Sequence, residues 1–198
     1  MTHSVRFINS IHEIGAKTWK LLLHSDNPFL RFEFLAALED GQCIDTPSHP
    51  KQLEKPLNSG WIPHYAVLEN DALEILAIAP VFKKLHSFGE YVFDWSWADA
   101  YEHHGLCYYP KLVWAIPFTP STGPRIIGQG RPELIQRYYQ QIASALTQYC
   151  QQHDYSSWHC LFPNAMANEA LSSPAPRYLS NGDSDNKIMQ RQSCQFHW

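Results

Sequence analysis

The longest regular pattern of apolar positions lies at residues 132–152. Apolar side chains recur there at the spacing of an α-helix, at Leu134, Ile135, Tyr138, Ile142, Ala145, Leu146 and Tyr149. Pro132 suits the first helical turn, where a backbone N–H has no partner within the helix. The pattern therefore predicts a helix from Pro132 to Gln152 whose Ile142 and Leu146 face a sheet.

Two short helices are predicted near the N-terminus. The first covers residues 11–23, where the apolar residues fall near one helical face. The second begins at an N-cap, either Asp26 or Asn27, carries Pro28 in its first turn and stops at Gly41. We expect both helices to cover part of a sheet.

Two apolar runs at residues 61–68 and 72–82 flank the polar triplet Glu69-Asn70-Asp71, a pattern typical of a β-hairpin. Shorter elements are expected as strands at 112–118, 125–127, 157–162 and 187–196, helices at 95–103 and 164–171, and loops at 46–60 and 172–186. Together these elements predict an α/β (α+β) fold, with a mixed, mainly antiparallel sheet flanked by helices.

Composition narrows the class of protein. The chain has 198 residues, 44% hydrophobic and 17% charged, which is enough for one domain with its own core. Its net charge of -4 gives no overall positive field for a phosphate backbone, so DNA is not an expected partner. The five cysteines form no C-x-x-C pair, which favours a reducing compartment. No run of about 18 apolar residues predicts a membrane span, so we expect a cytoplasmic protein.

Three common catalytic motifs are missing. His12-Glu13 lacks the second histidine of a zincin, and Gly15-Ala16-Lys17-Thr18 lacks the leading glycine of a P-loop. No G-x-S-x-G of an α/β-hydrolase occurs either. These three chemistries therefore lack their usual sequence evidence.

The loop before the long helix carries a candidate cofactor site. Arg125, Gly128 and Gly130 match the R-x-x-G-x-G pattern with which acyltransferases of the GNAT superfamily hold the pyrophosphate of coenzyme A. Backbone N–H groups at a helix start suit an anion, although Pro132 removes one of them. The alternative is an ordinary strand-to-helix loop.

Acidic and aromatic residues alternate irregularly between residues 86 and 101, as they often do around a pocket. Aromatic walls with a few carboxylates suit an amine, sugar or acyl substrate. Glu90, Asp94 or His103 is the candidate base, and Tyr101 or Tyr108 the candidate proton donor. The alternative makes the aromatic residues part of the core and Asp94 or Asp99 a helix cap.

The tetrapeptide Tyr101-Glu102-His103-His104 offers two imidazoles and a carboxylate. Adjacent histidines on a helix point about 100° apart and rarely bind one metal ion. No metal site is predicted, and the alternative is that these four residues form the polar end of a helix.

Several runs resemble one bacterial family, the FemAB-like "peptidoglycan biosynthesis/recognition" family of the GNAT superfamily. The resemblance covers nearly the whole chain and is most specific in its centre. The runs are Asn27 to Leu30, Phe34 to Glu39, Pro80 to Lys84, His86-Ser87, Gly89 to Asp94, Trp97-Ala98, Ala100 to Glu102, Tyr108 to Leu112, Pro117 to Pro120 and Thr122 to Arg125.

The resemblance implies a GNAT-like fold and transfer of an acyl or aminoacyl group to an amine. Acyl-CoA or aminoacyl-tRNA is the implied donor, and a small molecule or cell-wall precursor the acceptor. We expect residues 1–198 to form a single domain, the N-terminal half of a longer two-lobed protein. Its apolar partner surface, near Phe196 and Trp198, would meet the missing half or a second copy. The alternative is a non-catalytic module that binds peptidoglycan or an amino sugar.

Overall fold

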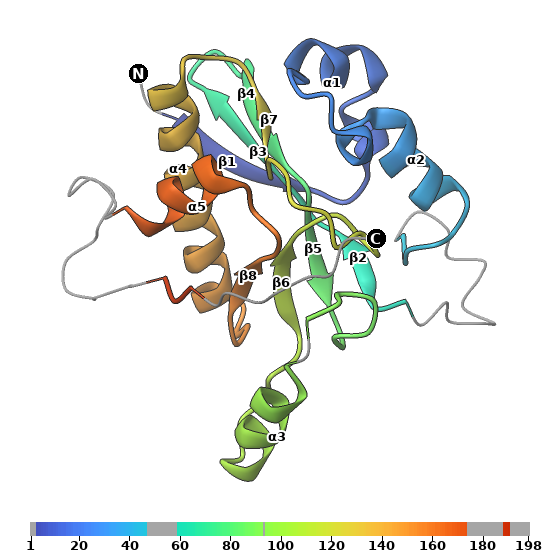
Figure 1. Ribbon diagram of the computed structural model, residues 1–198, viewed down its shortest axis with the longest axis vertical. Coiled ribbons are helices and arrows are strands. Elements are labelled where there is room, and N and C mark those ends of the chain that lie inside the picture. Colours follow the sequence, from blue (N-terminus) through green and yellow to red (C-terminus); the bar gives the residue numbers. More distant parts are fainter. Residues whose placement is uncertain (1–2, 47–58, 93, 174–187, 191–198) are drawn as a thin grey trace.

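Two four-stranded sheets form the centre of the fold (Figure 1). The computed structural model describes residues 3–46, 59–92, 94–173 and 188–190. One sheet has the strand order β1-β3-β4-β7 and the other β2-β5-β6-β8. The strands are β1 (His3–Ile8), β2 (Trp61–Pro63), β3 (Tyr65–Asn70), β4 (Ile75–Ala79), β5 (Val81–Lys84), β6 (Lys111–Trp114), β7 (Ile127–Gly128) and β8 (Trp158–Cys160).

A bent hairpin connects the two sheets. His64 interrupts the arm made of β2 and β3, and Pro80 interrupts the arm made of β4 and β5. Pairing continues across the bend, because the His64 N–H donates to the Val81 carbonyl at 2.9 Å. The hairpin prediction is confirmed. Neighbouring strands are antiparallel except β6 and β8, so the mixed, mainly antiparallel fold is confirmed as well.

Both faces of the hairpin are buried, and this explains its continuous apolar sequence. Successive side chains of a strand point to opposite faces. Tyr65 and Val67 therefore join one hydrophobic cluster, whereas Ala66 and Leu68 join another. Helices α1 (Ala16–Leu22) and α2 (Phe32–Asp40) cover the first face, and α4 (Pro132–Gln152) and α5 (Ala165–Ser172) cover the second (Figure 1).

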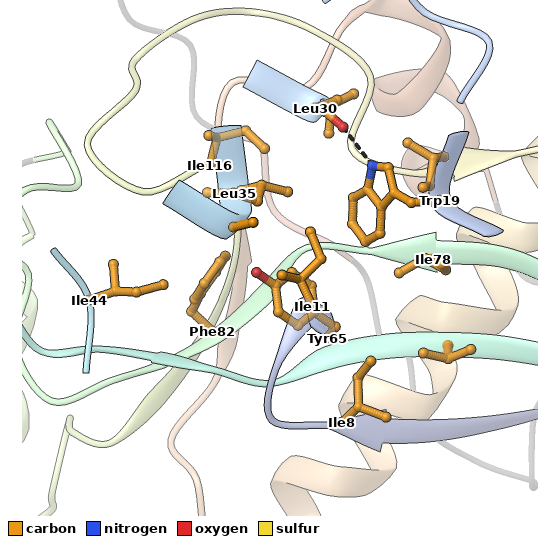
Figure 2. Packing of buried hydrophobic residues seen from close by; sticks show 14 of the residues in the cluster. Ile8, Ile11, Trp19, Leu30, Leu35, Ile44, Tyr65, Ile78, Phe82 and Ile116 are labelled. Atoms are coloured by element: carbon orange, nitrogen blue, oxygen red, sulfur yellow. Dashed lines mark hydrogen bonds between the residues drawn. The ribbon is translucent and has the colours of Figure 1, made fainter. Parts of the chain in front are cut away.

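Trp19 lies at the centre of the first cluster. Its indole Nε1 donates to the Leu30 carbonyl at 2.8 Å, and its ring meets Tyr65 edge-on (Figure 2). Nearby, Glu39 of α2 accepts hydrogen bonds from the Ser10 hydroxyl, the Ile11 N–H and the Tyr65 hydroxyl. This buried carboxylate thus links α2 to β3 and to the segment after β1.

The long helix agrees with its prediction. α4 covers Pro132–Gln152, and its Ile142 and Leu146 are fully buried in the second cluster with residues of β3 and β6. Burial of such side chains stabilises the fold by about 2 kcal/mol each. Asn164 caps α5 as predicted, with its side chain accepting from the Ala167 N–H at 3.0 Å.

Three local predictions need correction. β1 was not predicted, although His3–Ile8 alternates in burial and pairs with β3 along its whole length. The second predicted helix is broken, since a 3-10 turn η2 (Pro28–Leu30) capped by Asn27 precedes extended Arg31 and α2. Similarly, a 3-10 turn η1 (Ile11–Glu13) precedes α1, because Gly15 at φ 78° separates the two.

Of the remaining predicted segments, some lie in the described part of the chain and others lie outside it. The strand predicted at 112–118 ends at Trp114, and residues 188–190 of the strand predicted at 187–196 are not in a strand. Most of the two predicted loops, and the predicted patch at Phe196 and Trp198, lie outside the described residues. Within the described ranges, no helix is long and apolar enough to cross a membrane.

Helix α3 (Trp95–His103) has the predicted bounds but an unusual position. It projects away from the sheets, and none of its residues is buried (Figure 1). Isolated helices of this length are marginal in water, so the contacts at its first residues must fix it.

Candidate functional site

A buried lysine organises the residues that precede α3. Lys111, the first residue of β6, donates from Nζ to Glu90 Oε2 at 2.9 Å, to Asp94 Oδ2 at 2.5 Å and to Ser87 Oγ at 2.9 Å. The Tyr108 hydroxyl donates to the same Asp94 oxygen at 2.7 Å. We call these five buried residues the charged cluster. It brings together three candidate residues of the sequence analysis, Glu90, Asp94 and Tyr108.

The two carboxylates of the charged cluster differ electrostatically. Burial raises the pKa of Glu90, although Lys111 acts in the opposite direction. Burial would also raise the pKa of Asp94, but hydrogen bonds from Lys111, Ser87 and Tyr108 outweigh it and leave that pKa below its usual value. Glu90 is therefore the carboxylate that more readily accepts a proton.

Each carboxylate keeps one oxygen without a hydrogen-bond partner among the described residues. These atoms are Glu90 Oε1 and Asp94 Oδ1, and both are buried. Buried carboxylate oxygens are normally paired. By contrast, both oxygens of the equally buried Glu39 are hydrogen-bonded. Glu90 and Asp94 thus have free acceptor capacity that a donor group can use.

An aromatic hollow of about 290 Å³ lies beside the charged cluster, lined by Ser87, Phe88, Gly89, Tyr91, Val92 and Trp95. Phe88, Tyr91 and Trp95 are 67%, 57% and 55% exposed, an unusual display of large apolar rings. Tyr91 also adopts a φ of 58°, the left-handed region that a bulky residue rarely occupies. Glu90 and Asp94 do not line the hollow but are adjacent in sequence to residues that do.

Tyr101 and His103 lie on α3. The Tyr101 ring packs edge-on against Tyr108 at 5.2 Å between centroids. His103 is exposed near the helix end, where its Nδ1 donates to the Asp99 carbonyl at 2.6 Å. Tyr101 therefore adjoins the charged cluster, whereas His103 is bonded within its own helix.

The loop with Arg125, Gly128 and Gly130 is built around internal contacts. The buried Arg125 guanidinium donates to the carbonyls of Leu161, Pro124 and Ser121 at 2.7, 3.0 and 2.6 Å. A Cβ at Gly128 would lie 2.9 Å from the Leu76 carbonyl, and one at Gly130 would lie 2.8 Å from Leu134. Close packing thus accounts for both glycines, and these residues do not fit an open pyrophosphate site.

Metal ligands are not grouped in the described part of the chain. No cluster of three or more His, Cys, Asp or Glu side chains there has the arrangement of a metal site. His103 and His104 each bond a backbone carbonyl of their own helix.

Sequence reasoning missed Ser87, Lys84 and Lys111. Lysines at strand ends usually reach solvent, so neither Lys84 nor Lys111 was considered. One signal was available: Lys84 follows Phe82 at the spacing of two that places side chains on the same face of a strand. In the structure both faces of this hairpin are covered, and Lys84 is buried there.

Comparison with known proteins gives one match. A family model described as FemAB-like, peptidoglycan biosynthesis/recognition, matches residues 10–198. Among curated proteins and solved structures, nothing matches the chain. The match covers every strand except β1, together with the charged cluster and the hollow.

Proposed function

Because the chain belongs to the FemAB-like peptidoglycan biosynthesis/recognition family, we propose that it transfers an aminoacyl or acyl group to an amine of a cell-wall precursor. One observation supports the site: carboxylates with unpartnered oxygens lie beside a hollow walled by exposed aromatic rings. In this proposal the hollow binds the acceptor, and the charged cluster takes up a proton from the ammonium group of the acceptor.

The aromatic wall suits an acceptor that presents an ammonium group on an apolar stem or sugar ring. Phe88, Tyr91 and Trp95 offer ring faces that attract a cation and bury aliphatic surface. A volume of about 290 Å³ is at the small end for ligand pockets, so it holds one side chain or ring of a larger substrate. The rest of the precursor lies outside the hollow.

Glu90 is the proposed base. An ammonium is not nucleophilic, so one proton must leave before the nitrogen attacks the carbonyl of the donor. The proton passes to Glu90, whose pKa burial raises. A new C–N bond then forms as the ester C–O bond breaks, the second proton of the nitrogen passes to the departing alkoxide oxygen of the donor, and Glu90 releases the first proton to solvent. Glu90 ends in its starting state.

Asp94 and Tyr108 have supporting roles in this proposal. Asp94 stays ionised and attracts the incoming ammonium through Oδ1. The Tyr108 hydroxyl is already donated to Asp94, and burial raises the pKa of Tyr108 well above its usual value. Tyr108 therefore holds Asp94 in place, and Tyr101 supports the Tyr108 ring.

An aminoacyl ester suits this site better than a thioester of coenzyme A. The guanidinium that a pyrophosphate needs is bonded to three backbone carbonyls, as described above. An aminoacyl-tRNA needs no pyrophosphate pocket, and a polynucleotide can bind through local contacts despite the net charge of -4. We therefore place aminoacyl-tRNA first among the donors.

A transfer assay tests the proposal. Labelled aminoacyl-tRNAs and, separately, labelled acyl-CoA are incubated with the protein and a nucleotide-activated muropeptide that carries a free amine. We expect labelled muropeptide with wild-type protein, at least 100-fold less with Glu90→Gln, and unchanged transfer with Glu102→Gln, an exposed carboxylate on α3. Binding of the muropeptide without any transfer would instead favour the non-catalytic recognition module.

A further inference from the structure

Lys84 and Lys111 are direct partners across the antiparallel strands β5 and β6. Both side chains are fully buried, and Phe82 and Val113, two positions before and after them, belong to the first hydrophobic cluster. Like charges opposite each other in a sheet are unfavourable, and burial makes them more so. The fold must therefore provide specific compensation for this pair.

The compensation comes mainly from one segment. We define the rim segment as residues 87–92 together with Asp94. It supplies the walls of the hollow except for Trp95, and it supplies the N-cap of α3. Lys111 contacts Ser87, Glu90 and Asp94 of this segment. Lys84 Nζ donates to the Phe88 carbonyl at 3.0 Å and to the Ser59 carbonyl at 3.2 Å, and lies 4.2 Å from the Trp61 ring centroid.

The two lysines suit different protonation states. Lys111 uses three N–H donors, two of them on carboxylates, which requires an ammonium. Lys84 bonds two neutral carbonyls, and a neutral amine still offers two N–H donors. Burial lowers the pKa of Lys84 to about 8. Lys111 thus anchors the rim segment through charge-assisted hydrogen bonds, and Lys84 is an anchor that can lose its proton and keep its bonds to the two carbonyls.

Besides these contacts, Ser87 shares a hydrogen bond with the Tyr109 hydroxyl at 2.7 Å, and Val92 packs against the first hydrophobic cluster. None of the residues of the rim segment belongs to a strand, and its Phe88 and Tyr91 side chains are exposed rather than packed in the core. Gly89 at φ 78° and Tyr91 at φ 58° are both left-handed, which is strained for Tyr91. Apart from the packing of Val92, the contacts that hold the rim segment are therefore mainly polar.

We propose that Lys84 and Lys111 are positioning residues that together hold the rim segment in the shape that binds ligand. Opening of the rim segment hydrates Lys84 and breaks the contacts of Lys111 in the same event. The inference rests on the proposed function only for the identity of the ligand, since the anchoring itself is measurable without one.

Amide hydrogen exchange of the rim segment tests the role of Lys84. When the segment opens, the hydrated amine returns to its ordinary pKa of 10.5, so the open form binds more protons above pH 8. Raising the pH from 7 to 9 should therefore increase rim protection about tenfold, after correction for intrinsic exchange. Asp45, Glu90, Asp94 and Lys111 are the charged groups that face Lys84.

Lys84→Met should abolish this pH dependence. The matched control is Lys83→Met, because Lys83 is the preceding residue of β5 and lies against Tyr149 instead. The control should keep the tenfold change. The role of Lys84 would be overturned if rim protection in the wild type did not change with pH. It would also be overturned if Lys84→Met kept the wild-type dependence of rim protection on pH.

A pair of variants tests Lys111. Lys111→Met alone leaves two buried carboxylates unpaired and should lower the melting temperature strongly. Adding Glu90→Gln and Asp94→Asn removes those charges and should restore most of the melting temperature. Rim protection should nevertheless stay at least tenfold below wild type. Wild-type rim protection in the triple variant would overturn the role of Lys111.

These outcomes are separable from failure of the proposed function. If the transfer assay finds no activity but rim protection behaves as described, the anchoring stands and the chemistry does not. If transfer occurs, Lys84→Met should raise KM, since the rim segment shapes the acceptor site, and Lys83→Met should leave KM unchanged. An unchanged KM in Lys84→Met would contradict a positioning role.

Discussion

The Tyr108 hydroxyl donates a hydrogen bond of 2.7 Å to Asp94, the N-cap residue of α3. No other side chain of the described chain reaches Asp94 except those of Lys111 and Ser87. Since no residue of α3 is buried, these few polar contacts, together with the packing of Tyr101 on Tyr108, anchor the helix to the sheets. This arrangement makes the start of α3 sensitive to single polar substitutions.

Tyr108→Phe should lower the free energy of unfolding by about 2 kcal/mol, because it removes a hydrogen bond to an ionised carboxylate. Tyr101→Phe is the control, since the two rings pack together and only the Tyr108 hydroxyl is bonded to Asp94. It should change stability by less than about 0.5 kcal/mol. Urea denaturation at pH 7 measures both, and equal effects would contradict this account.

His64 should make the protein sensitive to acid. The ring stacks on Phe7, and neither nitrogen has a hydrogen-bond partner among the described residues. Burial, with Lys83 and His153 nearby, lowers the pKa of His64 to about 3 from its ordinary 6.5. The unfolded state therefore binds more protons between those values, and stability is lost as the pH falls through that window.

His64→Phe should remove part of that acid sensitivity. At pH 5 protonation of unfolded His64 lowers stability by about 2 kcal/mol, a loss that phenylalanine cannot show. Comparing the free energy of unfolding of both proteins at pH 7 and pH 5 isolates this difference. An identical loss in wild type and variant would show that His64 is not the responsible group.

Coenzyme A at millimolar concentration should leave the melting temperature unchanged, because Arg125 is bonded internally. Arg125→Met should lower stability by about 3 kcal/mol with or without coenzyme A, since it leaves buried carbonyls unpaired. Thermal unfolding followed by fluorescence measures both effects. A rise of several degrees with coenzyme A that the variant loses would restore the pyrophosphate site.

Gly89→Ala should destabilise the protein through a clash with Phe118. A Cβ at Gly89 would lie 2.7 Å from the Phe118 ring, and φ is 78°. Gly105 is the matched control, because its φ of 69° is similar and nothing lies within 4 Å. We expect a loss of about 1 kcal/mol for Gly105→Ala and at least about 2 kcal/mol for Gly89→Ala. Equal losses would mean that Phe118 moves aside freely.

Local sequence patterns predicted the elements that depend on neighbouring residues, such as helix caps, and the elements whose apolar residues recur at a regular spacing. The bounds of α3 and α4, the Asn164 cap and the hairpin followed from spacing, capping chemistry and apolar runs. β1 was missed because its alternation is short and its stability comes from pairing with β3, more than fifty residues away. Pairing partners are not encoded in a local window.

The residues of the candidate site likewise divide into those that the sequence indicated and those that only the structure revealed. The sequence indicated Glu90, Asp94 and Tyr108, because carboxylates interleaved with aromatic residues are a pattern that often surrounds a pocket. It could not assign their environment, since Lys111 meets them only when β6 lies beside β5. Arg125 shows the opposite case: its motif resembled an anion site, but folding directs the guanidinium to backbone carbonyls.

The sequence alone determined the bounds of α3 and α4 and the presence of the hairpin, that the chain has enough apolar surface for a core, and which family it resembles. The tertiary structure decided which charges are buried and what they contact. The physical reason is that desolvation and charge pairing depend on distances of a few ångströms between residues remote in sequence. For Lys84 and Lys111, 27 positions apart, those distances exist only after two strands pair and the rim segment covers them.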